Sequence, residues 1–400
     1  MQKRRLFLTI LAVLLALLIV AGVVLTSQWN KPLGQTVVLA TRTPTSAPTE
    51  ATPAQTQEAP TAGTQPTQTE EPTNAPTLTP TFTAEPQPVC GSDRLKYYLV
   101  AGIGDRDNQY MYGLADVVRI VRVDFVKPEV SVLTLPRDML VQFTDVVDPN
   151  GVPLVQGKLN QAWFFGSPGK NYFKGEGYGP GLMAQTIANN FDLYVDHYGA
   201  LNMQIFIDLI DAMGGVDIYL PEFVDGRPIG EESFDLDKSQ GFFDAGWNHM
   251  NGQDALSFVR IRARYGEVKR TDNQTLLICA IKDQISDPSI IKTIPKLVSS
   301  FIENTQTDLS LKQISDLLCL LPKLNGNNLK FFHIPMKDKY NPDGLLEASL
   351  AEIAQVEGQS YVYTYDSAKL KAFIDEFEAG TLEPIKGTGK STCPENPPKP

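Results

Sequence analysis

The stretch that decides the fold runs from position 117 to position 135 and reads VVRIVRVDFVKPEVSVLTL. Along Val117–Phe125 the side chains alternate between the two sides of an extended chain, and Val130–Leu135 is a second apolar segment. Such segments predict strands. Pro128 stands between them and requires a turn, because proline cannot take part in the interior of a sheet. Leu95–Ile103 predicts another strand upstream, so this part of the chain is expected to form a sheet.

Helical patterns follow these strands. Asn202 is the expected N-cap of a helix that reaches Met213, and Gly214–Gly215 ends it. The other predicted helices cover residues 181–191, 254–264, 271–285, 289–304, 309–321 and 367–378, and the other predicted strands cover residues 192–200, 216–220, 329–334 and 361–365. Because strands and helices mix throughout, the sequence predicts an α/β layered domain in which helices cover a mixed sheet.

The charge and the composition of the chain limit its partners. The sequence has 35 basic and 46 acidic side chains and a formal net charge of -11, so binding to nucleic acid through the charge of the whole chain is not expected. The three histidines are scattered and the four cysteines lack a CxxC spacing, which argues against a His-rich metal site, a zinc ribbon and a thioredoxin-like motif. Any basic site must therefore be a local cluster.

The N-terminus predicts a membrane anchor. Basic residues at positions 3–5 precede the apolar run Leu6–Leu25, which as a helix would cover about 30 Å, the thickness of the hydrocarbon core. Basic residues stay on the cytoplasmic side, so we expect residues 1–28 to form a cytoplasmic flank and a single transmembrane helix, with the main domain extracellular. The alternative is a cleaved signal peptide, although its apolar region normally spans only about 7–15 residues.

Composition divides the rest of the chain into three parts. Residues 29–92 are rich in threonine, proline, alanine and glutamine, and they are predicted to be a disordered linker. Residues 93–378 are long enough for one substantial core and form the predicted folded domain. Residues 379–400 are rich in glycine, proline and lysine and are predicted to be a loose tail.

The four cysteines suggest one disulfide at the ends of this domain. Cys90 and Cys393 lie just outside its two ends, which favours a bridge between them in an extracellular protein. Cys279 and Cys319 lie in apolar helical patterns, where buried free cysteines and a second bridge both remain open.

A run of arginines is the strongest candidate for a binding site. Arg260, Arg262 and Arg264 alternate with apolar residues, and Arg270 and Gln274 follow. An extended backbone would turn the three alternating arginines to one side. Guanidinium groups offer paired donors that match phosphate oxygens, so the run suggests a pyrophosphate or polyanionic ligand. The alternative is a solvated basic strand, or a set of ion pairs with Glu267 and Asp272.

Acidic residues mark the ends of the first two strands. Asp105 and Asp107 follow the first strand, and Asp116 opens the second. Strand ends lie at a common edge of a sheet, so carboxylates that converge there would suit Mg²⁺, which prefers oxygen ligands. Ordinary turn aspartates are the alternative for any one of them alone.

Further segments join these residues in a fixed order. They are Ala115–Asp116, Thr134–Asp138, Lys158–Ala162, Met213–Ile218, Met250–Leu256, Val259–Arg262, Arg270 with Gln274, Thr307–Ser310 and Ser360–Glu378. In this order they resemble the LytR-CpsA-Psr family of membrane-anchored cell-wall glycopolymer phosphotransferases. The resemblance covers nearly all of residues 95–378, and the ordered set is specific.

The resemblance implies an α/β/α sandwich with a central mixed sheet and a hydrophobic pocket for a polyprenyl lipid. Arginines would hold the pyrophosphate at the pocket mouth, and two aspartates would hold Mg²⁺ or Mn²⁺. By matching position, the pyrophosphate binders are Arg137, Arg260, Arg262, Arg270 and Gln274, and the catalytic set is Arg137, Asp138, Arg260 and Arg262. The metal ligands are Asp105 and Asp116, while Asp138 orients Arg137. Either Asp116 or Asp138 would accept the hydroxyl proton, and metal binding would preclude that role for Asp116.

The expected activity is transfer of a glycopolymer from a polyprenyl-pyrophosphate carrier to a peptidoglycan hydroxyl, forming a phosphodiester in cell-envelope assembly. The expected partners are the lipid-linked glycopolymer, peptidoglycan and membrane lipid, without nucleic acid. Leu114 stands where the family often has an arginine, and Gln161 where it commonly has a histidine, so fewer cationic groups are expected at the site. The alternatives are a non-catalytic module that binds polyprenyl phosphates and a hydrolase of the pyrophosphate.

Overall fold

The computed structural model describes residues 29–34, 36, 85–104, 113–227, 241–262, 266–285, 306–339, 341–384 and 389–399. The chain divides into two compact units, residues 1–41 with 88–400 and residues 42–87. Only residues 85–87 of the second unit are described, and the fold is that of the first unit.

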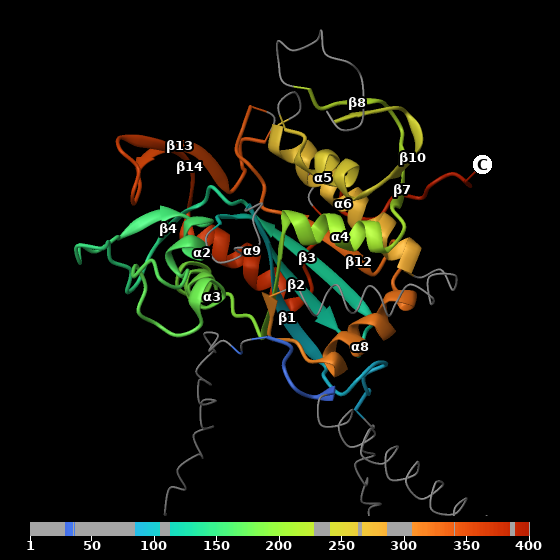
Figure 1. Ribbon diagram of the computed structural model, residues 1–400, viewed down its shortest axis with the longest axis horizontal. Coiled ribbons are helices and arrows are strands. Elements are labelled where there is room, and N and C mark those ends of the chain that lie inside the picture. Colours follow the sequence, from blue (N-terminus) through green and yellow to red (C-terminus); the bar gives the residue numbers. More distant parts are fainter. Residues whose placement is uncertain are drawn as a thin grey trace, which may run out of the picture. The chain divides into compact units, whose positions relative to one another are not determined.

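A six-stranded sheet forms the centre of this unit (Figure 1). In spatial order its strands are β11 (Gln306–Thr307), β6 (His197–Asn202), β1 (Leu95–Ile103), β2 (Ala115–Asp124), β3 (Glu129–Leu135) and β12 (Leu329–His333). The pairs β1–β6 and β3–β12 are parallel, and the other neighbours are antiparallel. The prediction of an α/β domain with a mixed sheet is therefore confirmed.

The β2–β3 hairpin forms as its alternating pattern predicts. Val121 pairs with Val132, and the ladder ends at Asp124. The Asp124 carboxylate accepts hydrogen bonds from the main-chain N–H groups of Val126 and Lys127, which closes the turn. The proline of this turn therefore stays out of the ladder, where its missing N–H would leave a gap.

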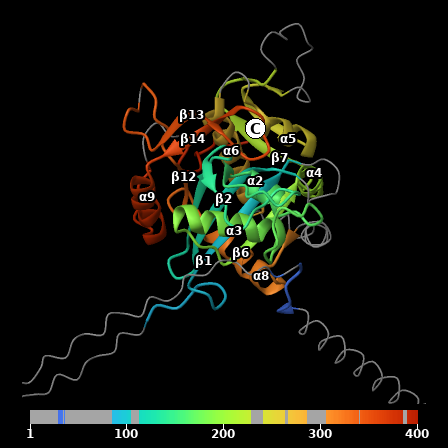
Figure 2. The same cartoon turned by 90° about the vertical axis from the view of Figure 1, so that its left-hand side faces the viewer.

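Helices cover both faces of the sheet (Figures 1 and 2). They are α2 (Gln161–Phe165), α3 (Tyr178–Phe191), α4 (Met203–Ala212), α5 (Gly252–Arg260), α6 (Gly266–Ile285), α8 (Leu311–Leu320) and α9 (Ser367–Ala379). The helices α2, α3 and α9 share one apolar core with Leu99 and Ile120, and α6 and α8 share another with Val123 and Phe331. Neighbouring strand residues point to opposite faces, so one sheet supplies both cores.

A third apolar core joins α4, α5 and the middle of α6. Ile210, Phe258 and Leu277 meet in it, together with Val216 of β7. The remaining strands are β4 (Leu140–Gln142), β5 (Gln156–Lys158), β7 (Val216–Leu220), β8 (Val224–Asp225), β9 (Phe242–Phe243), β10 (Gly246–Met250), β13 (Leu346–Glu352) and β14 (Gln359–Tyr365), and a 3₁₀ helix covers Leu321–Lys323. The core shared by α4, α5 and α6 fixes the start of α6 relative to the end of α5.

Two predicted boundaries differ from the structure. The strand predicted from Asp192 begins only at His197, because Asp192 adopts a left-handed conformation with φ 54° at the end of α3. The helix predicted to continue past Arg260 ends there, because Ile261 is extended with ψ 120°. Both differences follow from a single backbone dihedral at a helix end, which apolar periodicity does not report.

Two disulfides pair the cysteines differently from the predicted arrangement. Cys90 is bonded to Cys319 on α8, and Cys279 on α6 is bonded to Cys393. The predicted Cys90–Cys393 bridge is therefore wrong, and neither helical cysteine is free. Cys90 and Cys393, which flank the domain, both reach the sheet face that α6 and α8 cover, so each meets a helix cysteine instead of the other.

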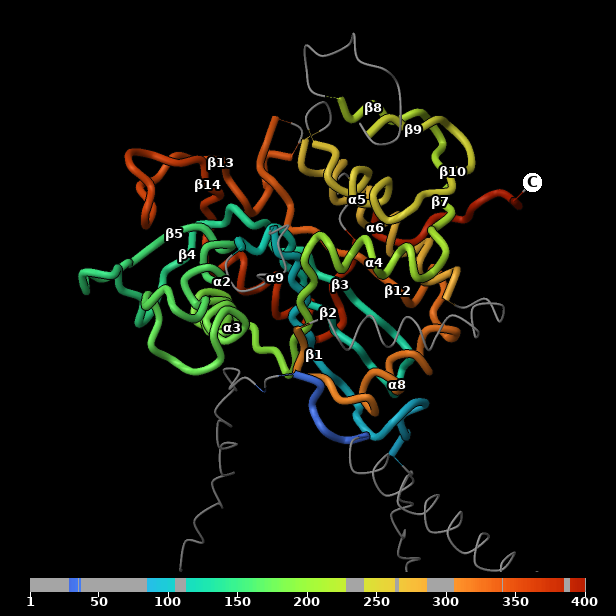
Figure 3. The backbone as a smooth tube through the Cα atoms, in the orientation of Figure 1, coloured from blue at the N-terminus to red at the C-terminus, as the bar shows by residue number. Residues whose placement is uncertain are grey.

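The C-terminal tail is attached to the domain over residues 389–399, although its composition predicts a loose segment. The Phe331 N–H donates to the Ser391 carbonyl at 2.8 Å, alongside β12. Lys399 reaches Asp217 on β7, with 2.8 Å between Nζ and Oδ2. Figure 3 shows the C-terminal segment, in red, running past β7. The tail binds along the open edge of β12, and its glycine and proline content does not predict this contact.

Two pieces of the predicted linker are attached as well. The Leu33 N–H donates to the Leu309 carbonyl at 2.9 Å, and the Val89 N–H donates to the Phe125 carbonyl at 2.8 Å. The predicted membrane helix and the helix predicted for residues 289–304 lie outside the described residues. Among the helices that are described, none is long and apolar enough to cross a membrane.

Candidate functional site

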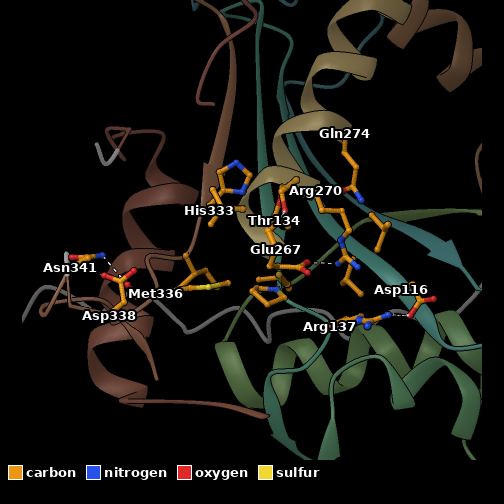
Figure 4. Close-up of a pocket in the computed structure, with 17 residues that line it drawn as sticks. Asp116, Thr134, Arg137, Glu267, Arg270, Gln274, His333, Met336, Asp338 and Asn341 are labelled. Atoms are coloured by element: carbon orange, nitrogen blue, oxygen red, sulfur yellow. Dashed lines mark hydrogen bonds and ion pairs between the residues drawn. The ribbon is translucent and has the colours of Figure 1, made fainter. Parts of the chain in front are cut away.

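A cavity of about 260 Å³ lies where β2 begins and β3 and β12 end, beside the first turns of α6 (Figure 4). These strand ends meet at one edge because β2 runs antiparallel to β3 and β12 runs parallel to it. The polar residues that line the cavity are Asp116, Thr134, Arg137, Glu267, Arg270, Thr271, Gln274, His333, Asp338 and Asn341.

One side of the cavity carries an ion pair. Asp116 opens β2 and Arg137 follows the end of β3, so the antiparallel register brings them together. Nη1 of Arg137 donates to Oδ1 of Asp116 at 2.6 Å. Burial alone would lower the pKa of Arg137, but the charges of Asp116 and Asp138 outweigh it and raise that pKa. Arg137 is therefore a firmly held cation at the edge of the cavity.

Asp138 lies behind Arg137 and is 9% exposed. Its Oδ2 accepts from Nε of Arg137 at 3.4 Å, and its Oδ1 accepts from Nζ of Lys158 at 2.8 Å. Gln161 supports the same segment, because its Oε1 accepts from the Lys158 N–H at 2.8 Å and its Nε2 donates to the Ala354 carbonyl at 3.0 Å. Both carboxylate oxygens of Asp138 thus face cations, which suits holding Arg137 in place.

The first turns of α6 supply the second charged group. Glu267, Arg270 and Gln274 are three and four residues apart and so share one face of the helix. Glu267 pairs with Arg270 and also with Arg262, whose Nε lies 3.5 Å from Oε2. Burial lowers the pKa of Arg270, and so do the charges of Arg137 and Arg262, in spite of Glu267. The cations therefore repel one another, and an anion in the cavity would relieve that repulsion.

The structure brings most of the predicted phosphate-binding residues together. Arg137, Arg270 and Gln274 line the cavity, and Arg262 joins them through its ion pair with the first turn of α6. Arg260 is exposed at the last turn of α5 and is not among the lining residues. An extended run would have turned Arg260 and Arg262 to the same side, but the helix ends between them.

Asp105, the predicted partner of Asp116 in metal binding, lies outside the described residues, as do Asp107 and Arg264. Gly104 lies against the Asp116 carboxylate, since a Cβ there would come within 2.5 Å of Oδ2. A larger residue at this position would require the Asp116 carboxylate to shift. Within the described ranges, no three His, Cys, Asp or Glu side chains gather as a metal site. The metal pair of Asp105 and Asp116 stays a prediction.

Several polar residues in or beside the cavity were not predicted from the sequence. Arg119 is 3% exposed, and its Nη2 donates to Oε1 of Gln274 at 2.8 Å. Thr134 and His333 line the cavity from the ends of β3 and β12. Glu267, which the sequence suggests only as an ion-pair partner, lies among the arginines. A charged residue within a predicted buried strand is the signal that points to Arg119, whereas nothing in the sequence singles out His333.

Two relatives carry the name polyisoprenyl-teichoic acid–peptidoglycan teichoic acid transferase. TagV of Bacillus subtilis (strain 168) is 28% identical over 218 residues, which is 54% of this chain and 50% of TagV. TagU of Halalkalibacterium halodurans is 25% identical over 269 residues, which is 63% of this chain and 78% of TagU. The chain thus spans half the length of the first relative and more than three quarters of the second.

The fold is also found in a solved structure. The crystal structure of TagV from B. subtilis has a TM-score of 0.54 and 21% sequence identity to this protein, covering 74% of this chain and 100% of that one. A family model described as LytR_cpsA_psr matches residues 57–369, well over half of the chain. The chain belongs to the LytR-CpsA-Psr family.

Proposed function

We propose that this protein transfers a glycopolymer from a polyprenyl-pyrophosphate carrier to a peptidoglycan hydroxyl, to which the polymer becomes joined by a phosphodiester. The observation that carries the proposal is the convergence of Arg137 and Arg270, from a strand end and a helix start, on one cavity. Family membership supports it, as do the names of the TagU and TagV relatives, which describe transfer of teichoic acid to peptidoglycan.

The reaction makes one bond to phosphorus and breaks another. The acceptor hydroxyl oxygen bonds to the phosphorus that carries the polymer, and the bond from this phosphorus to the lipid phosphate oxygen breaks. The hydroxyl loses its proton, and the carrier leaves as a polyprenyl monophosphate. Charge spreads over the phosphoryl oxygens and the leaving phosphate, so catalysis depends mainly on cations positioned in advance. Arg137 and Arg270 would bind these oxygens, and Arg262 would add charge beside them.

Asp116 suits a role in metal binding or in proton transfer, because a carboxylate that holds both Arg137 and a metal ion has no free oxygen for the hydroxyl proton. Its Oδ1 holds Arg137, while its Oδ2 lies beside Gly104, the residue before Asp105. A Mg²⁺ or Mn²⁺ ion held by Asp105 and Asp116 would supply Lewis-acid stabilisation of the phosphoryl oxygens. Of the two predicted proton acceptors, Asp116 lines the cavity, whereas Asp138 is buried between Lys158 and Arg137.

We predict that Asp138→Asn lowers kcat/KM for transfer by about tenfold, because the loss of a charge-assisted contact frees Arg137 to move. Lys158→Met removes the cation on the far side of Asp138 and is expected to give a loss of similar size. The two variants separate positioning from proton transfer. A severe loss in Asp138→Asn with wild-type rates in Lys158→Met would mean that Asp138 is the base.

We infer that the domain lies outside the cell on a single membrane helix with a cytoplasmic N-terminus. The two disulfides support this placement, because such bonds persist in oxidising compartments. The Leu33–Leu309 hydrogen bond attaches the chain to the domain shortly after the predicted helix. This contact would keep the domain near the membrane that holds a polyprenyl carrier.

Protease added to intact cells is expected to release a disulfide-bonded fragment that contains the domain and to leave a membrane-bound N-terminal stub. The reason is the basic flank at positions 3–5, which keeps that end in the cytoplasm. Immunoblotting of the medium and of the membrane fraction measures this. A processed protein in the medium of untreated cells would instead indicate signal cleavage.

The proposed function is tested by supplying the full-length protein with a polyprenyl-pyrophosphate-linked glycan, peptidoglycan and Mg²⁺. Mass spectrometry of the digested peptidoglycan should detect the glycan joined through a phosphodiester. A hydrolase would release free glycan phosphate regardless of peptidoglycan, and a binding module would leave the lipid-linked glycan intact. Either of these two results would contradict transfer.

A further inference from the structure

The floor of the cavity collects buried polar atoms without hydrogen-bond partners. Within the described part of the chain these include Nη1 of Arg119, Oγ1 of Thr134, Nε of Arg270 and Nε2 of His333. Buried polar atoms are ordinarily paired, so four unpaired ones at a single place need an explanation. Three of them belong to residues that line the cavity, and the fourth belongs to the partner of Gln274, which also lines it.

The sheet places three of these residues in one row. Arg119 on β2 lies opposite Thr134 on β3, and Thr134 lies opposite His333 on β12. All three belong to the strand positions that face α6, the helix that carries Arg270 and Gln274. Figure 4 shows the side chains of Thr134, His333 and Arg270 around the same cavity. The four unpaired atoms therefore come from two facing layers of the fold.

Arg119 has a buried charge without a counter-charge. Arg119 is only 3% exposed, and its guanidinium donates a hydrogen bond to the uncharged amide of Gln274. No carboxylate of the described residues lies within ion-pair distance of it, and the nearby charge is the cation Arg270. Burial, together with Arg270, lowers the pKa of Arg119 to about 10, so it stays charged at neutral pH. A buried cation of this kind costs free energy unless an anion joins it.

Arg122 is a buried structural arginine on the same strand, β2, and serves as a comparison. It lies three residues along β2 on the opposite face and is 6% exposed. Its guanidinium lies 3.6 Å from a Glu129 oxygen and 4.0 Å from an Asp124 oxygen, and it donates to the Glu378 carbonyl at 3.1 Å. Nη1 lacks a hydrogen-bond partner in both arginines, so the two differ in charge pairing. Carboxylates lie beside Arg122, whereas no carboxylate of the described residues lies beside Arg119.

We propose that Arg119, Thr134, Arg270 and His333 form an inner anion site that takes a phosphate-type group. The proposal rests on the proposed function and deepens it: Arg137 binds one phosphate of the pyrophosphate at the edge of the cavity, and the inner site takes the other. The guanidinium N–H groups of Arg119 and Arg270 and the Thr134 hydroxyl supply the donors. Burial and the charge of Arg119 lower the pKa of His333 to about 4, so His333 completes the floor as a neutral ring.

The test measures binding to the full-length protein by calorimetry, with inorganic pyrophosphate and farnesyl pyrophosphate as the two probes. Arg119→Met should weaken binding by roughly tenfold to a hundredfold, because a charge-assisted contact is lost. Its melting temperature should stay the same or rise, since an apolar chain of similar length replaces an unpaired buried charge. Thr134→Val keeps the shape and should weaken binding by about two- to tenfold.

Arg122→Lys is the matched control, because Arg122 is a buried arginine on the same strand with its charge already paired. It should leave the affinity for both probes unchanged, whatever it does to stability. Loss of affinity for both probes in Arg119→Met assigns the site to the pyrophosphate itself. Loss for farnesyl pyrophosphate alone assigns it to a lipid-borne head group, and loss for inorganic pyrophosphate alone assigns it to a free anion.

Wild-type affinity for both probes in Arg119→Met and Thr134→Val would overturn the inner site. If Arg137→Ala still weakened binding in that case, the proposed function would stand without it. If Arg119→Met weakened binding but the wild-type protein made no phosphodiester, the inner site would stand and the proposed function would fail. If Arg119→Met did not fold, the affinity of Thr134→Val for the two probes would decide whether the inner anion site exists.

Discussion

Replacement of Arg137 by alanine is expected to lower kcat/KM for polymer transfer by about a hundredfold or more, because one preorganised donor to a developing phosphoryl charge is removed. Arg137 is held from two sides, by Asp116 at 2.6 Å and by Asp138 at 3.4 Å. Its loss would also leave the Asp116 carboxylate unpaired next to an anionic substrate. The measurement is the steady-state rate of glycan transfer at several substrate concentrations.

Two further substitutions, Arg137→Lys and Arg260→Ala, test whether the loss in Arg137→Ala comes from the phosphate site. Arg137→Lys is expected to recover only part of the rate, since a single ammonium cannot face a phosphate and two carboxylates as a planar guanidinium does. Arg260→Ala is expected to lose less than Arg137→Ala, because Arg260 is exposed and outside the cavity lining. If Arg137→Ala kept the wild-type rate, or if Arg260→Ala were the more damaged of the two, the assignment of the phosphate site would be wrong.

Removal of the Cys279–Cys393 disulfide is expected to lower the free energy of unfolding by about 2–5 kcal/mol. The bond closes a loop between residues 114 positions apart, so without it the unfolded chain gains conformational freedom. It also holds the tail against β12, where Phe331 donates to Ser391. Urea unfolding of a Cys279→Ser, Cys393→Ser double variant, followed by circular dichroism, measures the loss.

The corresponding Cys90→Ser, Cys319→Ser variant provides the comparison. This bond joins residues 229 positions apart and ties the entry of the domain to α8, so a loss of comparable size is expected. Equal urea midpoints for the wild type and both double variants would contradict a stabilising role. Recovery of the wild-type midpoint by a single-cysteine variant would show that the measured loss had another cause.

The centre of the fold could be predicted from the sequence because its strands are strongly patterned. In β2 and β3 apolar side chains occur on both faces, and Pro128 marks the turn between them. Asn202 caps α4 as predicted, with its side chain accepting from the Ile205 N–H. In β2, β3 and α4 the local sequence signal and the tertiary packing favour the same structure, so the local signal is sufficient to predict it.

The parts that were not predicted depend on contacts between distant segments. The partner of Cys90 is decided by which helix lies closest in space, and the attachment of the tail depends on an open edge at β12. For the arginine run the sequence favoured both a helix over residues 254–264 and an extended backbone, and the structure divides them, because α5 ends at Arg260 and Ile261 is extended. Short β4 and β5, which hold Lys158 near Asp138, have too few residues to show a period.

The residues of the candidate site also divide into those that local sequence motifs predict and those that only contacts between distant segments reveal. Arg137, Arg270 and Gln274 were found by matching motifs, since each belongs to a segment with a recognisable order. Thr134 belongs to the same matched segment as Arg137, but no role was predicted for it, and His333 belongs to an ordinary apolar strand. The pairing of β3 with β12 brings both side chains to the cavity. The inner anion site could therefore be inferred only once the sheet register was known.

The most direct test of the proposed transfer follows the phosphorus atom itself. A polyprenyl-pyrophosphate-linked glycan labelled with ³²P at the phosphate next to the sugar is incubated with the full-length protein, peptidoglycan and Mg²⁺. The label is expected in peptidoglycan, resistant to phosphatase until the phosphodiester is cleaved, with unlabelled polyprenyl monophosphate as the second product. Label that leaves with the lipid, or that appears only in free glycan phosphate, would contradict a phosphotransferase.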